Sequence, residues 1–327
     1  MDQNDQVKHL VGEWEHGALS RREFLERAIL IFGGLAGAEA LLAACSPAVL
    51  PSPVPPTGTA TAAATTAPIG APTGAPQATT APATPAAAAI PGFVDPSAVD
   101  TSQVTYPSGD VKISALLAKP KGSGSWPAVI VIHENRGLTD HIQDVTRRIA
   151  NLGYVALGVD LLSRVGGTQK FAPPADPTQA INGLKQPDID ADLTASVAYL
   201  KSQSFVKPKL GVVGFCWGGG NSLLTAVNNK DIAACVVFYG RNPSNIDDVQ
   251  KIAGAVIGNY GELDQGITPG VPALEAAMKK YNKPFEYKIY PGANHAFFND
   301  TGPRFNEAAA KDAWARLVEF YKKNLQG

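Results

Sequence analysis

Apolar and polar residues follow two patterns between residue 99 and the end of the chain. Over residues 101–119 they alternate around the turn letters PSGD at 107–110, which predicts an antiparallel hairpin. Further along, short continuous apolar runs such as PAVIVIHE and KLGVVGF are typical of strands that are buried on both faces of a sheet. The hairpin and these runs predict a central sheet.

Segments with helical spacing separate the apolar runs. Over residues 140–152, Ile142, Val145 and Ile149 share one face of a predicted helix. Further strands are predicted at YVALGVDLL, IAACVVFYG, GAVIGNYG and FEYKIYPG, and further helices over residues 188–203, 273–281 and 306–325. This alternation predicts an α/β fold, with a mainly parallel central sheet, helices on both faces and the hairpin on its N-terminal side.

The segment before this domain has a different composition. Residues 46–94 are almost entirely Ala, Pro, Thr, Gly and Ser, and none of them is charged. They offer few large apolar side chains, so burial cannot offset the entropy lost on ordering them. We therefore expect a disordered, Ala/Pro/Thr-rich linker over residues 46–98 and one folded domain over residues 99–327.

The first 45 residues carry the features of an export signal. SRREFL, at residues 20–25, is a twin-arginine pattern, and an interrupted apolar stretch follows it over residues 28–44. The stretch ends in LAAC, which resembles the lipobox of bacterial lipoproteins, where the cysteine, here Cys45, is lipidated. We expect residues 1–45 to be a twin-arginine-type lipoprotein signal peptide. The protein is then exported, extracytoplasmic and anchored to the cell membrane by lipid.

Charge and cysteine content exclude several classes of function. The net charge is −1 at pH 7 and no basic block is present, which argues against nucleic acid as a partner. Three cysteines are too few for a disulfide framework. His133 and His141 lack the i, i+4 spacing of a helical zinc motif, so no metal is expected. Nor is a cofactor expected, and a monomer is compatible with these features.

The sequence GFCWG at residues 214–218 places Cys216 between two glycines, after a predicted strand and before a helix-like stretch. This is the context of a nucleophile elbow, in which Gly214 and Gly218 permit a strained turn and a close helix start. A thiolate is a strong nucleophile, and the N-terminus of a helix favours its negative charge. Cys216 is therefore the predicted nucleophile. Cys235, in the middle of a predicted strand, is interpreted as a core residue that forms no disulfide with Cys216.

The acid and the histidine of such a site follow the nucleophile along the chain. His295, in YPGANHAFF, is the one histidine after Cys216, and Asp264, in GNYGELDQG, lies between the two after another predicted strand. Glu262, in the same loop, is the alternative acid. His141 lies on the face of a predicted helix and is expected to be solvated. The predicted triad is Cys216, Asp264 and His295.

The sequence VIHENRGL marks a loop at the end of an early strand. In sites of this kind that loop supplies one backbone N–H of an oxyanion hole, and the residue after the nucleophile supplies the other. Asn135 and Trp217 are the two candidates. Glu134, an acid at the tip of a buried strand, could accept the thiol proton or hold the thiol in place.

Four spaced motifs, HENRG, GFCWGGG, GELD and NHAFFND, resemble those of the dienelactone hydrolase family within the α/β-hydrolase superfamily. The resemblance covers about residues 101–327 and implies an α/β-hydrolase fold. It implies that Cys216 is the nucleophile, that Asp264 and His295 complete the triad, and that Glu134 pairs with the resting thiol and helps to activate it. The family's reaction is hydrolysis of a dienelactone to maleylacetate through an acyl-enzyme.

Two positions depart from the family's pattern. The best-known members hold the substrate carboxylate with two arginines, one of which lies four residues after the histidine, where this chain has Asn299. Arg304, later in the same loop, and Arg164, after the second buried strand, are the candidates for substrate binding. We therefore expect the type of reaction that the family catalyses, whereas the sequence does not predict dienelactone as the substrate.

Three classes of function remain after this comparison of motifs. The first is a hydrolase that cleaves a small-molecule carboxylic ester or lactone through a cysteine acyl-enzyme. The second is a thioesterase or another acyl hydrolase, such as a small peptidase, on the same scaffold. The third is a surface-anchored binding module without catalysis. The intact triad and Glu134 favour the first class.

Overall fold

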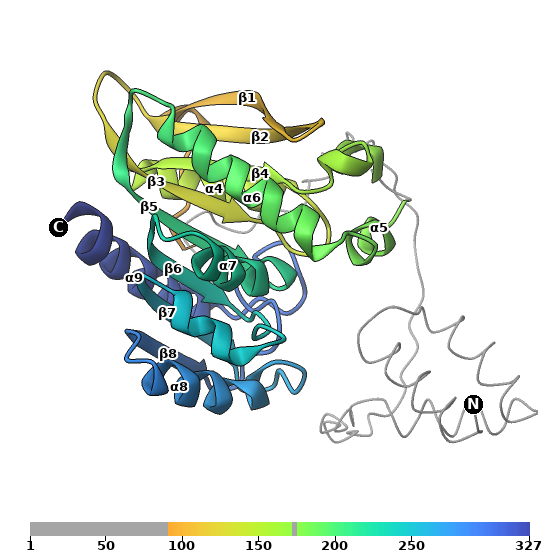
Figure 1. Cartoon of the computed structure of the whole chain (residues 1–327), viewed down its shortest axis with the longest axis vertical. Coiled ribbons are helices and arrows are strands. Elements are labelled where there is room, and N and C mark those ends of the chain that lie inside the picture. The colour runs from red at the N-terminus through yellow and green to blue at the C-terminus, as the bar shows by residue number, and fades with distance from the viewer. Residues whose placement is uncertain (1–90, 172–174) are drawn as a thin grey trace, which may run out of the picture. The chain divides into compact units, whose positions relative to one another are not determined.

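The computed structural model describes residues 91–171 and 175–327 (Figure 1). The expected signal peptide, Cys45 as the expected site of lipidation and nearly all of the expected linker lie outside the described residues. In the described part of the chain, no helix is both long and apolar enough to span a membrane.

Strands and helices alternate along this domain. The strands are β1 (Val99–Ser108), β2 (Val111–Pro120), β3 (Trp126–Ile132), β4 (Val155–Asp160), β5 (Val206–Phe215), β6 (Ile232–Phe238), β7 (Ala255–Gly261) and β8 (Phe285–Tyr290). The helices are α4 (Asp140–Asn151), α5 (Thr178–Asn182), α6 (Gln186–Lys201), α7 (Trp217–Asn228), α8 (Val271–Lys280) and α9 (Glu307–Tyr321). Short 3-10 turns connect several of them, and a π-helical turn (Lys322–Gln326) follows α9.

The eight strands form one sheet in the order β1-β2-β4-β3-β5-β6-β7-β8. The pairs β1–β2 and β2–β4 are antiparallel, and every pair from β4 to β8 is parallel. The predicted hairpin is confirmed, with Gly109 at φ +58° in its turn. The parallel strands all end at one edge, so the loops that follow β3, β5, β6, β7 and β8 meet there.

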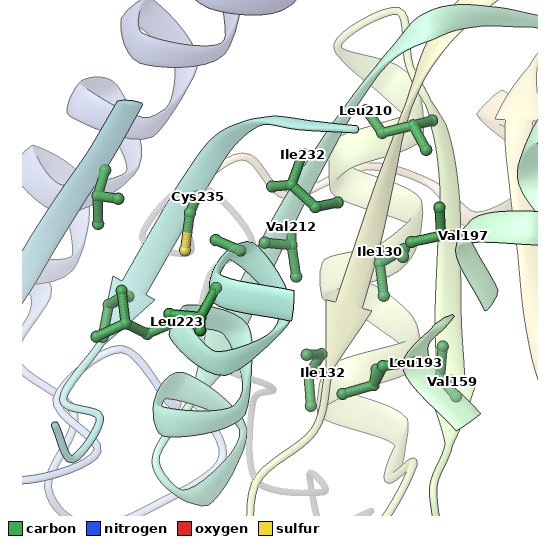
Figure 2. Packing of buried hydrophobic residues seen from close by; sticks show 14 of the residues in the cluster. Ile130, Ile132, Val159, Leu193, Val197, Leu210, Val212, Leu223, Ile232 and Cys235 are labelled. Carbon is green, nitrogen blue, oxygen red and sulfur yellow. The ribbon is translucent and has the colours of Figure 1, made fainter. Parts of the chain in front are cut away.

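Two separate apolar cores cover the two faces of this sheet. Residues of α6, α7 and α8 pack on one face, and residues of α4 and α9 pack on the other. In Figure 2, Leu193 and Val197 of α6 lie beside the β3 side chains, and Leu223 of α7 lies near Val212 of β5. Because both faces are covered, the buried stretches of the central strands are almost entirely apolar, as the continuous runs predicted. The fold is the expected α/β-hydrolase architecture.

Residues 91–98, which the sequence analysis assigns to the linker, contact the domain. The carbonyl of Pro91 accepts a hydrogen bond from Nη1 of Arg148, at 3.2 Å, and Val94 is buried. A Cβ on Gly92 would lie 2.4 Å from the indole of Trp314, so the backbone there packs directly against α9. These contacts place the start of the ordered domain several residues before β1.

Candidate active site

Cys216 occupies the sharp turn between β5 and α7. Its φ of +58° and ψ of −120° lie in a region that residues with a Cβ rarely adopt. Its backbone N–H donates to the carbonyl of Phe238 at 3.1 Å, and its own carbonyl accepts from Gly219 at 2.9 Å. The strained turn places the half-buried thiol at the N-terminus of α7, at the carboxyl edge of the sheet.

The two flanking glycines allow this turn for steric reasons. A Cβ on Gly214 would lie 1.8 Å from the carbonyl oxygen of Gly218, and a Cβ on Gly218 would lie 2.3 Å from the carbonyl oxygen of His133. Both approaches are far inside van der Waals contact with backbone atoms. The elbow geometry predicted from the glycine spacing is therefore present.

His295 and Asp264 form a close pair on the loops after β8 and β7. The Nδ1 of His295 lies 2.6 Å from Oδ2 of Asp264, whose side chain is only 7% exposed. Burial alone would lower the pKa of His295, but hydrogen bonds to Asp264 and Cys216, with the charges of both, raise it to about 9. Because Nδ1 is taken by Asp264, Nε2 is the nitrogen left to face the thiol.

Glu262, the alternative acid, has a different contact. Its Oε2 accepts a hydrogen bond from the backbone N–H of Gly292, at 2.8 Å. This contact stabilises the loop before His295. Asp264 also accepts from the N–H of Gly266 at 3.2 Å, which fixes its carboxylate in place. Of the two acids that the sequence left open, Asp264 is the one that contacts His295.

Glu134 is buried at the end of β3, and its two oxygens differ in their surroundings. Oε2 accepts a hydrogen bond from the side-chain amide of Asn299, at 2.7 Å. Oε1 is buried and has no hydrogen-bond partner among the described residues. The contact with Asn299 was not predicted from the sequence, which marked that position only as lacking an arginine. Glu134 therefore has a neutral hydrogen-bond donor there.

The ring of His133 holds the backbone of the loop after β3. Its Nε2 accepts from the N–H of Leu161 at 3.2 Å, so its Nδ1 carries the proton and donates to the carbonyl of Glu134 at 2.6 Å. Burial lowers the pKa of His133, which keeps the ring neutral, as this pattern needs. The ring also stacks on Trp217, with centroids 5.5 Å apart. His133 thus fixes the peptide that leads into Asn135.

The two candidates for the oxyanion hole lie on different segments. Asn135 is in the loop after β3, and Trp217 is at the start of α7. Asn135 is half-buried in the loop after β3. Trp217 is the first residue of α7, and the first N–H groups of a helix have no acceptor within it. Each position is suited to present a backbone N–H at the carboxyl edge of the sheet.

Tyr239 belongs to this group, although sequence reasoning missed it. It follows β6 directly, at φ +39°, and its ring lies 5.1 Å from that of His295. Burial raises the pKa of Tyr239 well above its ordinary value, and the nearby charges of Glu134 and Cys216 add to the rise. Its position in the sequence could have indicated this, because Tyr239 follows β6. That strand lies next to β5, which carries the nucleophile, and ends at the same edge of the sheet.

The two candidate arginines have different surroundings. The guanidinium of Arg164 donates to both carboxylate oxygens of Asp192 on α6, at 2.7 and 2.8 Å, and does not join the group around Cys216. Arg304 is exposed, and its charge acts on the hydroxyl of Tyr239 and partly offsets the rise in that residue's pKa. Of the two, Arg304 is the one whose charge acts on Tyr239.

The expectation for His141 was wrong, whereas that for Cys235 is confirmed. His141 is buried, with Nδ1 at 3.0 Å from Oδ1 of Asp300, because its face of α4 packs on the loop that carries Asp300. Cys235 is a free thiol within the core, and burial raises its pKa to about 12 (Figure 2). Cys216 is also free, so no disulfide joins them.

Comparison with known proteins agrees with this architecture. The model of the dienelactone hydrolase family matches residues 113–325. The chain belongs to that family. A relative from Saccharolobus solfataricus, named "Putative carboxymethylenebutenolidase", is 38% identical, over 68% of this chain and 98% of the relative. A relative of the same name from Methylorubrum extorquens is 32% identical, over 73% and 86% of the two chains.

A solved structure supports the same assignment. The crystal structure titled "Putative Dienelactone Hydrolase" from Klebsiella pneumoniae has a TM-score of 0.64 and 28% sequence identity to this chain. It covers 69% of this chain and is itself covered over 99% of its length. Family membership identifies the protein as a hydrolase that acts on ester or lactone bonds, with a small molecule as substrate.

Proposed function

We propose that this hydrolase cleaves a carboxylic ester or lactone through a covalent intermediate on Cys216. The observation that carries the proposal is the 2.6 Å contact between His295 and Asp264, because it leaves the second imidazole nitrogen facing the thiol of the elbow. Nucleophile, base and orienting acid in this relation are the parts that acyl transfer requires.

In the first half of the reaction the thiol proton passes to His295, either directly or by way of Glu134. The sulfur then attacks the carbonyl carbon, and the carbonyl electrons move to the oxygen. The N–H groups of Asn135 and Trp217 stabilise this oxyanion, each by roughly 2.7–4 kcal/mol of transition-state free energy. When the oxyanion collapses, the C–O bond breaks, the leaving oxygen takes a proton from protonated His295, and a thioester remains.

In the second half, neutral His295 takes a proton from water, and the hydroxide attacks the thioester carbonyl. The C–S bond breaks and the carboxylic acid leaves. The thiolate returns beside protonated His295, which is stabilised by Asp264. The pKa of about 9 for His295 supports an ion pair with the thiolate in the resting site. No cofactor enters any step.

The test is mass spectrometry of the protein quenched during turnover of a slow aryl ester. We expect an acyl adduct on the peptide that contains residues 214–218, and none in Cys216→Ala. The buried thiol of Cys235 serves as an internal control, because it should remain unmodified in both proteins. An adduct elsewhere, or equal turnover by wild type and Cys216→Ala, would overturn the proposed mechanism.

We further propose that the chain is exported and held at a membrane through lipid on Cys45. The support is the order of the twin-arginine pattern, the apolar stretch and the LAAC sequence in residues 1–45. Incorporation of a labelled fatty acid into wild type but not into Cys45→Ala, with recovery of wild type in the membrane fraction, is the expected result. Equal labelling of both proteins would exclude this site of lipidation.

A further inference from the structure

Two buried polar atoms beside the thiol lack partners, and they complement each other chemically. Oε1 of Glu134 and the hydroxyl of Tyr239 each lack a hydrogen bond of standard geometry among the described residues, yet the Glu134 side chain acts on the hydroxyl as an acceptor and adds to the rise in the pKa of Tyr239. A carboxylate oxygen is an acceptor and a phenol is a donor. Burying either one unpaired costs about 1–3 kcal/mol, so each of these atoms requires an explanation.

Packing does not explain the hydroxyl of Tyr239. Its ring fills an aromatic cluster with Phe215, Phe238 and Phe297. A phenylalanine would fill the same space without burying an unpaired oxygen. The backbone of Tyr239 is also strained, at φ +39°, which is rare for a residue with a bulky side chain. Strain together with an unpaired polar group is more typical of a functional position than of a core tyrosine.

The charged groups around the hydroxyl come from several elements. Glu134 faces it from the loop after β3, and Cys216 from the turn before α7. His295 lies beside its ring, and Arg304 acts on it from the loop before α9. Since its pKa is raised well above the ordinary value, the phenol keeps its proton over the whole working range of pH. The Tyr239 hydroxyl is therefore a hydrogen-bond donor throughout this range, and it faces the Glu134 carboxylate.

We propose that Tyr239 is a positioning residue whose hydroxyl donates a hydrogen bond to Oε1 of Glu134 and, together with Asn299 at Oε2, holds that carboxylate in place beside the Cys216 thiol. This inference rests on the proposed function, in which Glu134 acts on the thiol proton. Glu134 has no Lys or Arg partner among the described ion pairs, so two neutral donors take the place of a cation. A donor on each oxygen fixes the orientation of the carboxyl group.

The test measures the pH dependence of Cys216 alkylation by iodoacetamide in the full-length protein. Alkylation reports the state of the thiol without ester hydrolysis, so the result does not depend on finding a substrate. The variants are Tyr239→Phe, Glu134→Gln and the double variant. Tyr260→Phe is the matched control, because Tyr260 also has a buried hydroxyl without a partner but lies near Cys235 instead of Glu134.

We expect the step in the alkylation profile that is lost in Glu134→Gln to be about tenfold lower in rate in Tyr239→Phe, because a carboxylate that the hydroxyl no longer holds can turn away from the thiol. The Tyr260→Phe profile should match wild type, and the double variant should match Glu134→Gln. Thermal unfolding should show that all variants fold, because each phenylalanine keeps the aromatic ring in its packing and removes only one oxygen.

Three results would overturn the proposal. The first is a Tyr239→Phe profile that coincides with that of wild type, and the second is a wild-type profile without any step that depends on Glu134. The third is an equal slowing by Tyr239→Phe with and without the Glu134 carboxylate, which would place the hydroxyl on the thiol directly. The acyl adduct on Cys216 is measured separately, so failure of the proposed function is distinguishable from failure of this inference.

Discussion

The side-chain amide of Asn299 donates to the Glu134 carboxylate across 2.7 Å and joins two loops that are 165 residues apart in sequence. The contact gives Glu134 a neutral partner in place of a cation. It also ties the loop after His295 to the end of β3. Changes at residue 299 should therefore alter the thiol through Glu134 and leave the rest of the domain intact.

We expect Asn299→Asp to lower kcat/KM at pH 7 by about tenfold, because two carboxylates at this distance repel and come to share a proton. The measurement is the pH profile of aryl ester hydrolysis, in which the loss should be greatest where both groups are ionised. Asn306→Asp is the control, since it adds the same charge at the N-cap of α9, where a carboxylate is favourable. Equal losses in both variants would mean that added charge, not the contact, is responsible.

Gly214→Ala should destabilise the fold by about 3 kcal/mol or more and abolish activity, because its Cβ would meet the carbonyl of Gly218 at 1.8 Å. Neither backbone segment can move without displacing Cys216. Gly183→Ala is the matched control, at φ −82° with its nearest contact at 3.4 Å, and should change stability little. Urea unfolding of the two variants measures the difference, and a Gly214→Ala protein as stable as wild type would contradict the elbow geometry.

The free energy of unfolding should depend on pH through His295. The folded-state pKa of His295 is raised to about 9 from the ordinary 6.5, so its contribution is fully present below pH 6.5 and is lost as the pH rises through 9. The expected loss is up to about 3 kcal/mol between pH 6.5 and 10. Chemical unfolding across that range should show this slope in wild type, and a much smaller slope in His295→Gln. Parallel slopes would argue against the pairing with Asp264 and Cys216.

Arg304→Ala should raise KM about tenfold for an ester that carries a carboxylate, and leave KM unchanged for a neutral ester of the same shape, because the exposed guanidinium is the cation near Tyr239. Arg164→Ala should instead lower stability by about 2 kcal/mol with both KM values unchanged, since it breaks the bidentate pair with Asp192. Steady-state kinetics and thermal unfolding of both variants separate the two roles. An increase in KM with Arg164→Ala would assign that arginine to the substrate.

The strands, the sheet class and the elbow followed from local sequence because each is encoded within a few residues. Continuous apolar runs specify strands covered on both faces, and the glycines on either side of Cys216 specify a turn that other residues would block. Chain order and strand ends were enough to place Asp264 and His295, although the choice between Asp264 and Glu262 required the structure. Most helix limits differed from expectation by one or two residues, as with α6, which begins at Gln186. The last predicted helix, over residues 306–325, is α9 only as far as Tyr321 and then a π-helical turn, and α5 was not predicted.

The contacts that the sequence did not predict are those between distant loops. Nothing near Glu134 indicates Asn299 or Tyr239 as its neighbours, since they meet only when β3, β6 and β8 end at one edge. His141 had a local signal that was overlooked, because it shares a face of α4 with Val145 and Arg148, at spacings of four and seven. That face is buried, and a polar side chain there needs a partner, which Asp300 provides.

The guanidinium of Arg148 binds the carbonyl of Pro91 and also the carboxylate of Asp300, the residue next to Asn299. A shortened version of the enzyme that omits the N-terminal segment should therefore begin no later than residue 91. Removal of Pro91 would leave a buried cation with one acceptor fewer, directly behind the loop that supports Glu134. The position at which the chain can be shortened therefore depends on Arg148 of α4, which binds Pro91. It does not depend on where the proline-rich stretch ends.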